Sequence, residues 1–286
     1  KKKSQAGSLE AQLREAEALT RAKLGHLDNE FDLIETKEEY DCYIQKAIEN
    51  GILSLDTETT GLDPMVDHIV GLCLYTPGLK PAYVPVAHES LVTGGLMKCN
   101  LNKQVAIDGM MRIKDAGVFI IFHHAKFDYE FLLVDFGVKF TVGWDTKIAS
   151  NMIDENARSH SLKNLYAEHI KQEDAPVLFE QLFKKLKFSY LNPATAKLYA
   201  AKDALMTYEL YLWQKKLIEK WRKEGGWEDW YKLLTEVEFP LTTVCGDMEL
   251  NGFRFDLDRA AELDEKYTAR MEEIQSRFNS IVAKYA

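Results

Sequence analysis

The sequence predicts an α/β fold, in which a mixed β-sheet carries helices on both faces and is followed by an α-helical segment. Residues 52–58, 69–76 and 81–86 are strand-like runs separated by glycine and proline turns, a pattern typical of an antiparallel meander. The continuous apolar run 118–122 lies between two helical patterns, as a strand buried on both faces does. Helical patterns fill most of the chain beyond residue 145, so we expect helices to cover the sheet.

The first elements are predicted by periodicity and by capping residues. Leucine and alanine residues at helical spacing in residues 9–24 predict an amphipathic helix, and residues 32–34 indicate a short strand. Thr36 followed by Glu39 matches a capping box, which opens a helix that runs to about Glu49. The Asn-Gly pair that comes next ends this helix before the meander begins.

The second half of the chain is predicted to be mostly helical. We expect helices at residues 103–116 and 127–136 and a short strand near 138–144. Residues 198–223 have a strongly helical pattern, which the glycine pair 225–226 ends. The remaining residues are helical on both sides of a turn that contains two phenylalanines.

Composition excludes several classes of protein. The chain has 286 residues, 46% of them apolar and 28% charged, and no apolar run approaches the roughly 20 residues of a membrane span. A formal charge of −9 argues against a surface coated with basic groups for nucleic acid, although residues 184–202 are locally basic, as a solvated face often is. Four cysteines without a C-x-x-C pair favour buried thiols in a reducing compartment over zinc or disulfides. Because the chain begins with Lys1 and not Met, we expect a piece of a longer protein.

Two carboxylates, Asp56 and Glu58, stand one residue apart at the polar end of the apolar run 52–55. Residues two apart on a strand share one face, so both carboxylates are expected to point the same way. Carboxylates prefer hard cations such as Mg²⁺ and Mn²⁺, and a pair of these ions is a recurring device for breaking phosphodiesters. An Asp-x-Glu pair is common by chance, however, and taken alone is more often a solvated strand end.

Three further residues belong to elements that can bring them to this pair. Asp128 comes just after the run 118–122, near the start of a helix, where open α/β sheets expose functional groups. The alternative is an aspartate that only stabilises the helix N-terminus. Tyr199 and Asp203 are four residues apart on a helical pattern and therefore share a face, although such a pair taken singly is usually found at the surface or the core edge.

Together these residues carry a resemblance to a known family. Asp56-x-Glu58, Asp128 and Tyr199-x-x-x-Asp203 resemble the three exonuclease motifs of the DEDD superfamily in its tyrosine-containing form. The sequence is more closely similar to the proofreading domain of family-A DNA polymerases, the DNA polymerase I type, from about residue 32 to 213. The similar segments are SLDTETTGL at 54–62, YVPVAH at 83–88, WDT at 144–146, YAAKD at 199–203, and two that resemble the opening of the polymerase thumb, EFPL at 238–241 and MELNG at 248–252.

The resemblance implies a fold, three parts and a set of partners. Residues 1–30 would be an N-terminal helical extension, residues 31–225 a ribonuclease H-like 3′→5′ exonuclease domain, and residues 226–286 the helical, truncated start of the polymerase thumb. The implied partners are DNA, as a single strand or a frayed 3′ end, and the rest of the polymerase chain. We expect a monomer without membrane contact, in the cytoplasm of a bacterial or phage-infected cell, with an organelle as the alternative.

The resemblance also implies a mechanism. The reaction would be hydrolysis of the terminal phosphodiester at a 3′ end, with two divalent metal ions, Mg²⁺ or Mn²⁺, as cofactors. Asp56, Glu58 and Asp203 would hold one ion, and Asp56 and Asp128 would position the second. Tyr199 would orient the attacking water.

Five more residues are implied to contact the substrate. Leu62 corresponds to the family's apolar residue wedged against the terminal base, and Phe179 to its aromatic stacking partner, although both residue types are also common in cores. Thr59 adjoins the first motif, and Arg158 aligns loosely with a phosphate contact. His124 stands where the family usually has asparagine, so it would hydrogen-bond near the terminal nucleotide, add a metal ligand or serve the structure alone.

Two alternatives remain at this point. The first is a stand-alone nuclease resembling ribonuclease D that acts on RNA, against which the thumb-like segment after residue 235 argues. The second is an inactive, exonuclease-like structural domain of a polymerase. The presence of all four carboxylates and of Tyr199 argues against it.

Overall fold

The computed structural model describes residues 2–170, 179–183 and 186–284, with side chains from residue 9 onward except at 179 and 180. The chain divides into two compact units, Lys1–Leu250 and Asn251–Ala286. The first unit contains the sheet and all the predicted site residues. The second consists mainly of one helix, α11 (Leu257–Val282).

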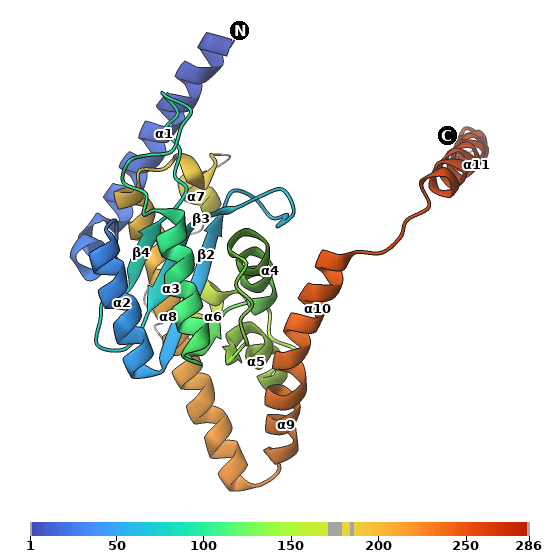
Figure 1. Ribbon diagram of the computed structural model, residues 1–286. Coiled ribbons are helices and arrows are strands. Elements are labelled where there is room, and N and C mark those ends of the chain that lie inside the picture. Colours follow the sequence, from blue (N-terminus) through green and yellow to red (C-terminus); the bar gives the residue numbers. More distant parts are fainter. Residues whose placement is uncertain (1, 171–178, 184–185, 285–286) are drawn as a thin grey trace. The chain divides into compact units, whose positions relative to one another are not determined.

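A six-stranded mixed sheet forms the centre of the first unit (Figure 1). Its strand order is β1-β4-β3-β2-β5-β6. Strands β2, β3 and β4 pair antiparallel and form the predicted meander. The other pairs are parallel: β1 with β4, β5 with β2, and β6 with β5. The strands are β1 (Asp32–Leu33), β2 (Ile52–Thr59), β3 (Ile69–Tyr75), β4 (Ala82–Pro85), β5 (Phe119–Phe122) and β6 (Trp144–Asp145).

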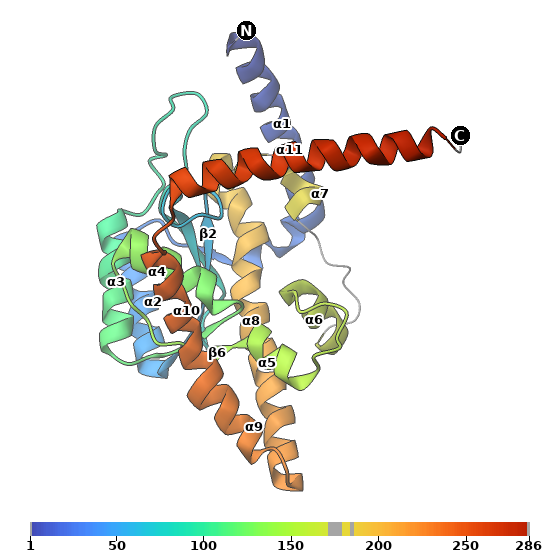
Figure 2. The ribbon, with the colours of Figure 1, turned by 90° about the vertical axis from the view of Figure 1, so that its right-hand side faces the viewer.

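Helices cover both faces of the sheet, as predicted (Figures 1 and 2). Alternation along β3 sorts the core into two clusters: Leu72 packs in the one that contains α2 and α3, and Cys73 in the one that contains α8. The helices of this unit are α1 (Lys2–Leu24), α2 (Lys37–Asn50), α3 (Lys103–Asp115), α4 (Ala125–Phe136), α5 (Thr146–Ile153), α6 (Leu162–His169), α7 (Phe179–Phe183), α8 (Pro193–Glu224), α9 (Glu228–Lys232) and α10 (Phe239–Asn251).

The helix ends follow local capping chemistry. Thr36 and Glu39 form the predicted capping box at the start of α2, and Gly51 ends that helix in the left-handed conformation, with φ of 65°. The long helix α8 starts five residues before the predicted Leu198, because the side chain of Asn192 caps it and Pro193 suits a first helical position.

The strand expected near residues 138–144 is largely wrong. Only Trp144 and Asp145 pair, with Ile121 and Phe122 of β5. Residues 138, 140 and 142 are all buried apolar residues and alternate as in a strand, but residues 138–143 form no strand. The N–H of Gly143 donates to the carbonyl of Ile120 in β5, at 3.0 Å, without a continuous ladder of strand pairs before residue 144. The alternation of apolar residues in 138–143 therefore indicates burial and not strand pairing.

The segment YVPVAH at 83–88 supports the sheet next to the site. The Tyr83 hydroxyl and Nε2 of His88 are 2.6 Å apart, and Nδ1 of His88 is 2.8 Å from the carbonyl oxygen of Leu191. Burial lowers the pKa of His88 to about 4. Residue 71 must be glycine here, because a Cβ at Gly71 would lie 2.2 Å from the Tyr83 hydroxyl.

The basic run at residues 184–202 does not form a simple solvated face. Lys197 is buried, and its ammonium lies 2.8 Å from the carboxylate of Asp28 and donates to the carbonyls of Asp28 and Phe31. Lys197 therefore anchors the segment before β1. Lys184 and Lys185 lie outside the described residues.

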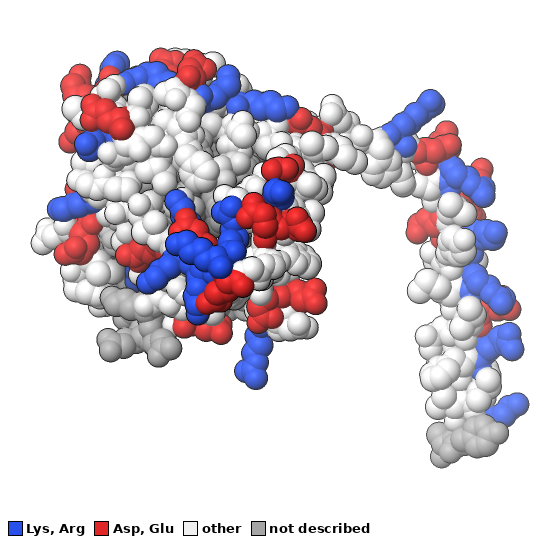
Figure 3. Space-filling view, turned by 90° about the horizontal axis from the view of Figure 1, so that it is seen from below, with Lys and Arg blue, Asp and Glu red and all other residues white. Residues whose placement is uncertain are grey.

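Surface charge is mixed in sign. On the face drawn in Figure 3, lysine and arginine side chains gather beside acidic ones. A groove of about 650 Å³ along the end of α8 has the same character, since Lys216, Lys220 and Lys223 line it together with Glu219 and Glu224. This agrees with the expectation, from the charge of −9, that the surface is not uniformly basic.

The structure also bears on the predicted absence of a membrane span and on the predicted burial of the cysteines. Among the helices of the described residues, none combines the length and the apolar character that crossing a membrane requires. The expectation of buried thiols is confirmed for Cys73 but wrong for Cys42, which is exposed on α2.

Candidate active site

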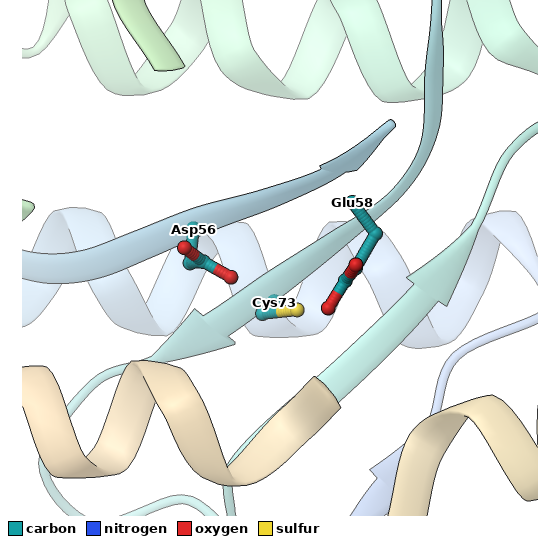
Figure 4. A group of neighbouring side chains, drawn as sticks. All are labelled: Asp56, Glu58 and Cys73. Carbon is teal, nitrogen blue, oxygen red and sulfur yellow. The ribbon is translucent and has the colours of Figure 1, made fainter. Parts of the chain in front are cut away.

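Strand β2 presents the acidic pair to one face of the sheet. Asp56 and Glu58 are both half-buried and are two residues apart, so they share the face on which α8 packs. Asp56 pairs in register with Cys73 of β3, and Figure 4 shows the two carboxylates on either side of the Cys73 sulfur. The predicted common orientation of the two acids is confirmed by this arrangement.

Helix α8 brings Tyr199 and Asp203 to the same face. The two residues are one helical turn apart, and alanines between and beside them, including Ala200 and Ala204, are fully buried against the sheet. Small side chains at this spacing let the helix approach the strands closely. As a result, the charge of Asp203 acts directly on Glu58 and raises its pKa, after the larger effect of burial.

Asp128, in the first turn of α4, is held from the other side of β2. It is only 2% exposed, and its Oδ1 accepts hydrogen bonds from the backbone N–H of Thr57, at 2.8 Å, and from the Thr57 hydroxyl, at 2.7 Å. The middle residue of the Asp-x-Glu motif thus fixes the third carboxylate. This role of Thr57 was missed in the sequence, where only the flanking acids attracted attention.

The four carboxylates disfavour one another's ionisation. Burial raises the pKa of Asp56 most, and the charges of Asp128, Glu58 and Asp203 raise it further. Burial also raises the pKa of Asp128, against the hydrogen bonds from Thr57, which lower it. The site therefore concentrates negative charge where water alone does not stabilise it.

Lys163, on α6, offsets this charge more than any other residue acting on Asp203, and it was not predicted. Its Nζ lies 3.4 Å from Asp203 Oδ2 and 3.8 Å from the centre of the Tyr199 ring, with only 18% of its side chain exposed. Burial disfavours its charge, but the neighbouring Asp203 and Tyr199 outweigh that effect and raise its pKa. Its motif, Ser-Leu-Lys-Asn-Leu, contains no acidic group, so no charge pattern marked it.

The donor set fits divalent cations. All four predicted ligands are carboxylates, which suit hard ions, and the ammonium of Lys163 cannot neutralise them all. In addition, Oδ1 of Asp203 is buried and has no hydrogen-bond partner in the described part of the chain. A buried acceptor without a donor is the position that a bound cation would satisfy.

Comparison with known proteins identifies the family. Residues 31–219 match the family model described as a 3′–5′ exonuclease. The chain belongs to this family.

The chain is 26% identical over 256 residues to DNA polymerase I of Pseudomonas aeruginosa, covering 84% of this chain and 26% of that protein. It is 30% identical over 231 residues to DNA polymerase I of Chloroflexus aurantiacus, covering 78% of this chain and 23% of that protein. This exonuclease chain therefore spans about a quarter of the length of these curated relatives.

A solved structure has the same fold. Brucella melitensis NrnC with bound Mg²⁺ superposes with a TM-score of 0.52 at 20% identity, covering 79% of this chain and 95% of that one. The ribonuclease H-like sheet with helices on both faces and helices after it is thus confirmed.

The last residue of β2 and the loop that follows it carry two of the predicted substrate contacts of this exonuclease. Leu62 is 84% exposed, which excludes the alternative that it is a core residue. Thr59 is half-buried at the end of β2, where its hydroxyl donates to the carbonyl of Gly61 at 2.6 Å. Asp67 ties the loop together by accepting hydrogen bonds from the Thr60 hydroxyl and the Asp63 N–H, so Leu62 projects from a braced turn.

The remaining predicted contacts differ in how the structure places them. Arg158 is exposed in the segment between α5 and α6. Phe179 begins α7, but its side chain lies outside the described residues. His124 is exposed at the N-terminal end of α4 and does not belong to a group of three potential metal ligands within the described residues.

His124 has an unusual backbone conformation that neighbouring groups fix. Its φ is 75°, the one positive value among the described residues other than glycine. The carboxylate of Asp145 accepts hydrogen bonds from the N–H groups of His124 and Ala125, and His123 contacts the hydroxyl of Thr146 at 2.8 Å. Asp145 and Thr146, from the segment WDT, therefore position the turn that leads to Asp128.

Proposed function

We propose that this chain is the proofreading part of a family-A DNA polymerase, which removes mismatched nucleotides from the 3′ ends of DNA by metal-dependent hydrolysis. One observation carries the proposal: Asp56, Glu58, Asp128, Asp203 and Tyr199 come from three distant segments and meet in one partly buried cluster. Asp128 is hydrogen-bonded to Thr57 between the two acids of β2, and Lys163 lies against both Asp203 and Tyr199. The likeness to two bacterial DNA polymerases I supports a polymerase parent. On this proposal, residues 31–225 are the exonuclease domain, 1–30 its extension and 226–286 the start of the thumb.

The carboxylates are proposed to hold two divalent ions, Mg²⁺ or Mn²⁺. Asp56, Glu58 and Asp203 would bind one, and Asp56 with Asp128 the other, so that Asp56 is shared. Bound divalent ions would lower the pKa of a coordinated water and neutralise charge that develops on the phosphate. Thr57 keeps Asp128 in place for this role through its two hydrogen bonds.

Tyr199 is proposed to orient the attacking water through a protonated hydroxyl. Burial and the charge of Asp203 raise its pKa, against the opposing effect of Lys163, so the phenol stays neutral at physiological pH. A neutral phenol can donate a hydrogen bond but does not serve as a strong base. Phe183 packs edge-on against the ring at 5.4 Å and Lys163 lies over it, which fixes the position of the hydroxyl.

The proposed substrate is a single-stranded or frayed 3′ end. Leu62 projects from its braced loop, where an apolar side chain can separate or pack against the last base. Stacking and apolar contact do not depend on base identity, which suits proofreading. Thr59, His124, Arg158 and Phe179 stay proposals for the other contacts.

A degradation assay tests the proposal. Labelled single-stranded DNA, a primer with a mismatched 3′ end and RNA of the same sequence would each be incubated with the chain and Mg²⁺. We expect stepwise shortening of DNA from the 3′ end with release of mononucleotides, faster at the mismatched than at the matched end, because a frayed terminus is less costly to unpair. Asp203→Ala should abolish shortening, whereas the control Asp115→Ala, an exposed acid on α3, should not.

Three results would contradict the proposal in different ways. Degradation of RNA but not DNA would favour a ribonuclease D-like enzyme. No degradation by the folded chain in Mg²⁺ or Mn²⁺ would favour an inactive structural domain. Equal activity of Asp203→Ala and the parent would remove the assigned site.

A further inference from the structure

A thiol lies beside the acidic pair and is not used in the proposed mechanism. Cys73 of β3 stands opposite Asp56 in the antiparallel register, and its side chain shares the face of Asp56 and Glu58. The sulfur and one oxygen of each carboxylate all lie within 4.8 Å of one another. Among the residues that the structure describes, this is the one group of three potential metal ligands so close together.

The surroundings of Cys73 are mostly apolar on the side away from the acids. The residue is 0% exposed and packs among Val70, Tyr83 and the alanines of α8, and the Tyr83 hydroxyl lies 2.6 Å from Nε2 of His88. No hydrogen bond to this thiol occurs within the described chain. Figure 4 shows its sulfur between the carboxylates of Asp56 and Glu58.

We propose that Cys73 converts the Asp56–Glu58 pair into a three-ligand site for borderline and soft divalent cations, the class of Zn²⁺ and Cd²⁺. The inference rests on the proposed function in so far as the same two carboxylates hold Mg²⁺ there. Hard ions such as Mg²⁺ take oxygen ligands and gain nothing from a thiol, whereas Zn²⁺ and Cd²⁺ bind sulfur and carboxylate oxygen together. The thiol therefore selects between two classes of ion at one place.

The geometry is close to what such an ion requires. Metal–sulfur and metal–oxygen bonds of about 2.3 and 2.1 Å at a tetrahedral angle place the donor atoms about 3.6 Å apart. The three donor atoms lie within 4.8 Å of one another, so a sulfur–oxygen pair must close by at most about 1.2 Å. Rotation about the side-chain bonds of Glu58 and Asp56 can supply this without moving the strands.

The step is a simple exchange. The S–H bond and one metal–water bond break and one metal–sulfur bond forms; the proton and the water pass to solvent, and no oxidant or reductant takes part. An ion held in this way occupies Asp56 and Glu58, which the nuclease needs for Mg²⁺. Zn²⁺ or Cd²⁺ would therefore compete with Mg²⁺, and the strength of that competition would depend on Cys73.

Absorption spectroscopy with Cd²⁺ tests the proposal independently of activity. In a variant with Cys42→Ser, Cys99→Ser and Cys245→Ser, Cys73 is the sole thiol. Titration with Cd²⁺ should produce a cadmium–thiolate charge-transfer band that saturates at one equivalent. Adding Cys73→Ser should remove the band and weaken Cd²⁺ binding, measured by calorimetry, about tenfold or more, since even indirect metal contacts are worth that much. Asp56→Asn in the same background should also weaken Cd²⁺ binding.

The outcomes separate this inference from the proposed function. Absence of the band in the folded single-thiol variant, or equal Cd²⁺ affinity with and without Cys73, would overturn the inference. If the single-thiol variant does not fold, the difference spectrum between the parent and Cys73→Ser gives the same decision. Mg²⁺-dependent DNA shortening is measured separately, so a chain with the band but without hydrolysis would refute the proposed function and leave the cadmium site intact.

Discussion

Asp145 and the cluster of acids around Asp56 differ in how their charge is stabilised. Asp145 is 1% exposed and accepts hydrogen bonds from four backbone N–H groups, those of His124, Ala125, Lys147 and Ile148. The four acids around Asp56 are offset mainly by Lys163, and an oxygen of Asp203 has no hydrogen-bond partner within the described residues. The charge of Asp145 is satisfied within the fold, whereas the cluster retains negative charge that the proposed divalent ions would neutralise.

This difference separates structural from functional acids more clearly than burial does. Backbone N–H groups stabilise the charge of Asp145 and in return Asp145 caps α4 and α5, so its contribution is to folding. The clustered acids raise one another's pKa values, which destabilises the metal-free fold and favours cation binding. Substitution in the two sets should therefore change different properties.

The largest expected effect is on catalysis. Asp56→Asn removes the proposed shared ligand without changing side-chain volume, and we expect 3′→5′ hydrolysis to fall by about 10³-fold or more, a loss of about 4 kcal/mol of transition-state stabilisation. The metal-free variant should be at least as stable as the parent, because one repelling charge is gone. Product release and thermal unfolding in chelator measure the two properties. A less stable but active variant would place Asp56 with the structural acids.

The second effect is on stability. Asp145→Ala leaves four backbone donors near two helix starts without their acceptor, and we expect the free energy of unfolding to fall by about 3 kcal/mol. Urea denaturation followed by circular dichroism measures it. Asp115→Ala, at an exposed site on α3, is the control and should stay within about 0.5 kcal/mol of the parent. An equal effect of both substitutions would refute the capping role.

The third effect concerns the lysine that partly completes the acid site. Lys163→Met keeps an unbranched side chain one atom shorter but removes the charge next to Asp203, and the metal-free protein should lose about 1–3 kcal/mol of stability. Saturating Mg²⁺ should restore most of that loss, because the cation replaces the missing positive charge. Unfolding in chelator and in Mg²⁺ gives the comparison. A loss that Mg²⁺ does not reduce would mean that Lys163 acts only by packing.

The fourth effect is on the pH dependence of stability. The clustered acids have raised pKa values in the folded chain, so the folded state binds more protons than the unfolded state above about pH 4, the ordinary carboxylate range. Metal-free stability should therefore fall as the pH rises from about 4 through the raised values. Melting temperature in chelator, compared between the parent and Asp56→Asn, should show a shallower fall in the variant.

Comparing the parent with Asp56→Asn also cancels the contribution of buried histidines to the pH dependence of stability, which has the opposite sign. Burial lowers the pKa of His88 to about 4 and of His123 to about 3, so these residues make stability rise with pH below the ordinary histidine value of about 6.5. Both proteins contain these histidines, and the difference between their curves reports the acids alone. Parallel curves for the parent and Asp56→Asn would contradict the assigned repulsion.

The smallest effect is expected at the substrate loop. Leu62→Ala should change the free energy of unfolding by less than about 0.5 kcal/mol, because the side chain is exposed. The rate on a paired 3′ end should fall more than the rate on single-stranded DNA, since only the former must be unpaired. The ratio of the two rates is the measurement, with exposed Val92→Ala as the control. An unchanged ratio would remove Leu62 from the proposed contacts.

Local patterns predicted much of the molecule. The capping box of α2, the meander β2-β3-β4, the central strand β5 and the helix that carries Tyr199 and Asp203 all follow from residues adjacent in sequence. The common face of Asp56 and Glu58 follows from the period of a strand. In residues 138–143 the alternation reflects burial without strand pairing, so the predicted strand there was wrong.

The tertiary structure alone decided which residues from different elements contact one another. Thr57 as the donor to Asp128, Lys163 as the counter-charge of Asp203, and Cys73 beside the acidic pair join residues far apart in sequence or concealed in apolar runs. Sequence periodicity fixes the direction of a side chain relative to its own strand or helix. Which side chains from other elements meet it, and hence whether a buried charge is satisfied, depends on packing between elements, and no local pattern encodes that.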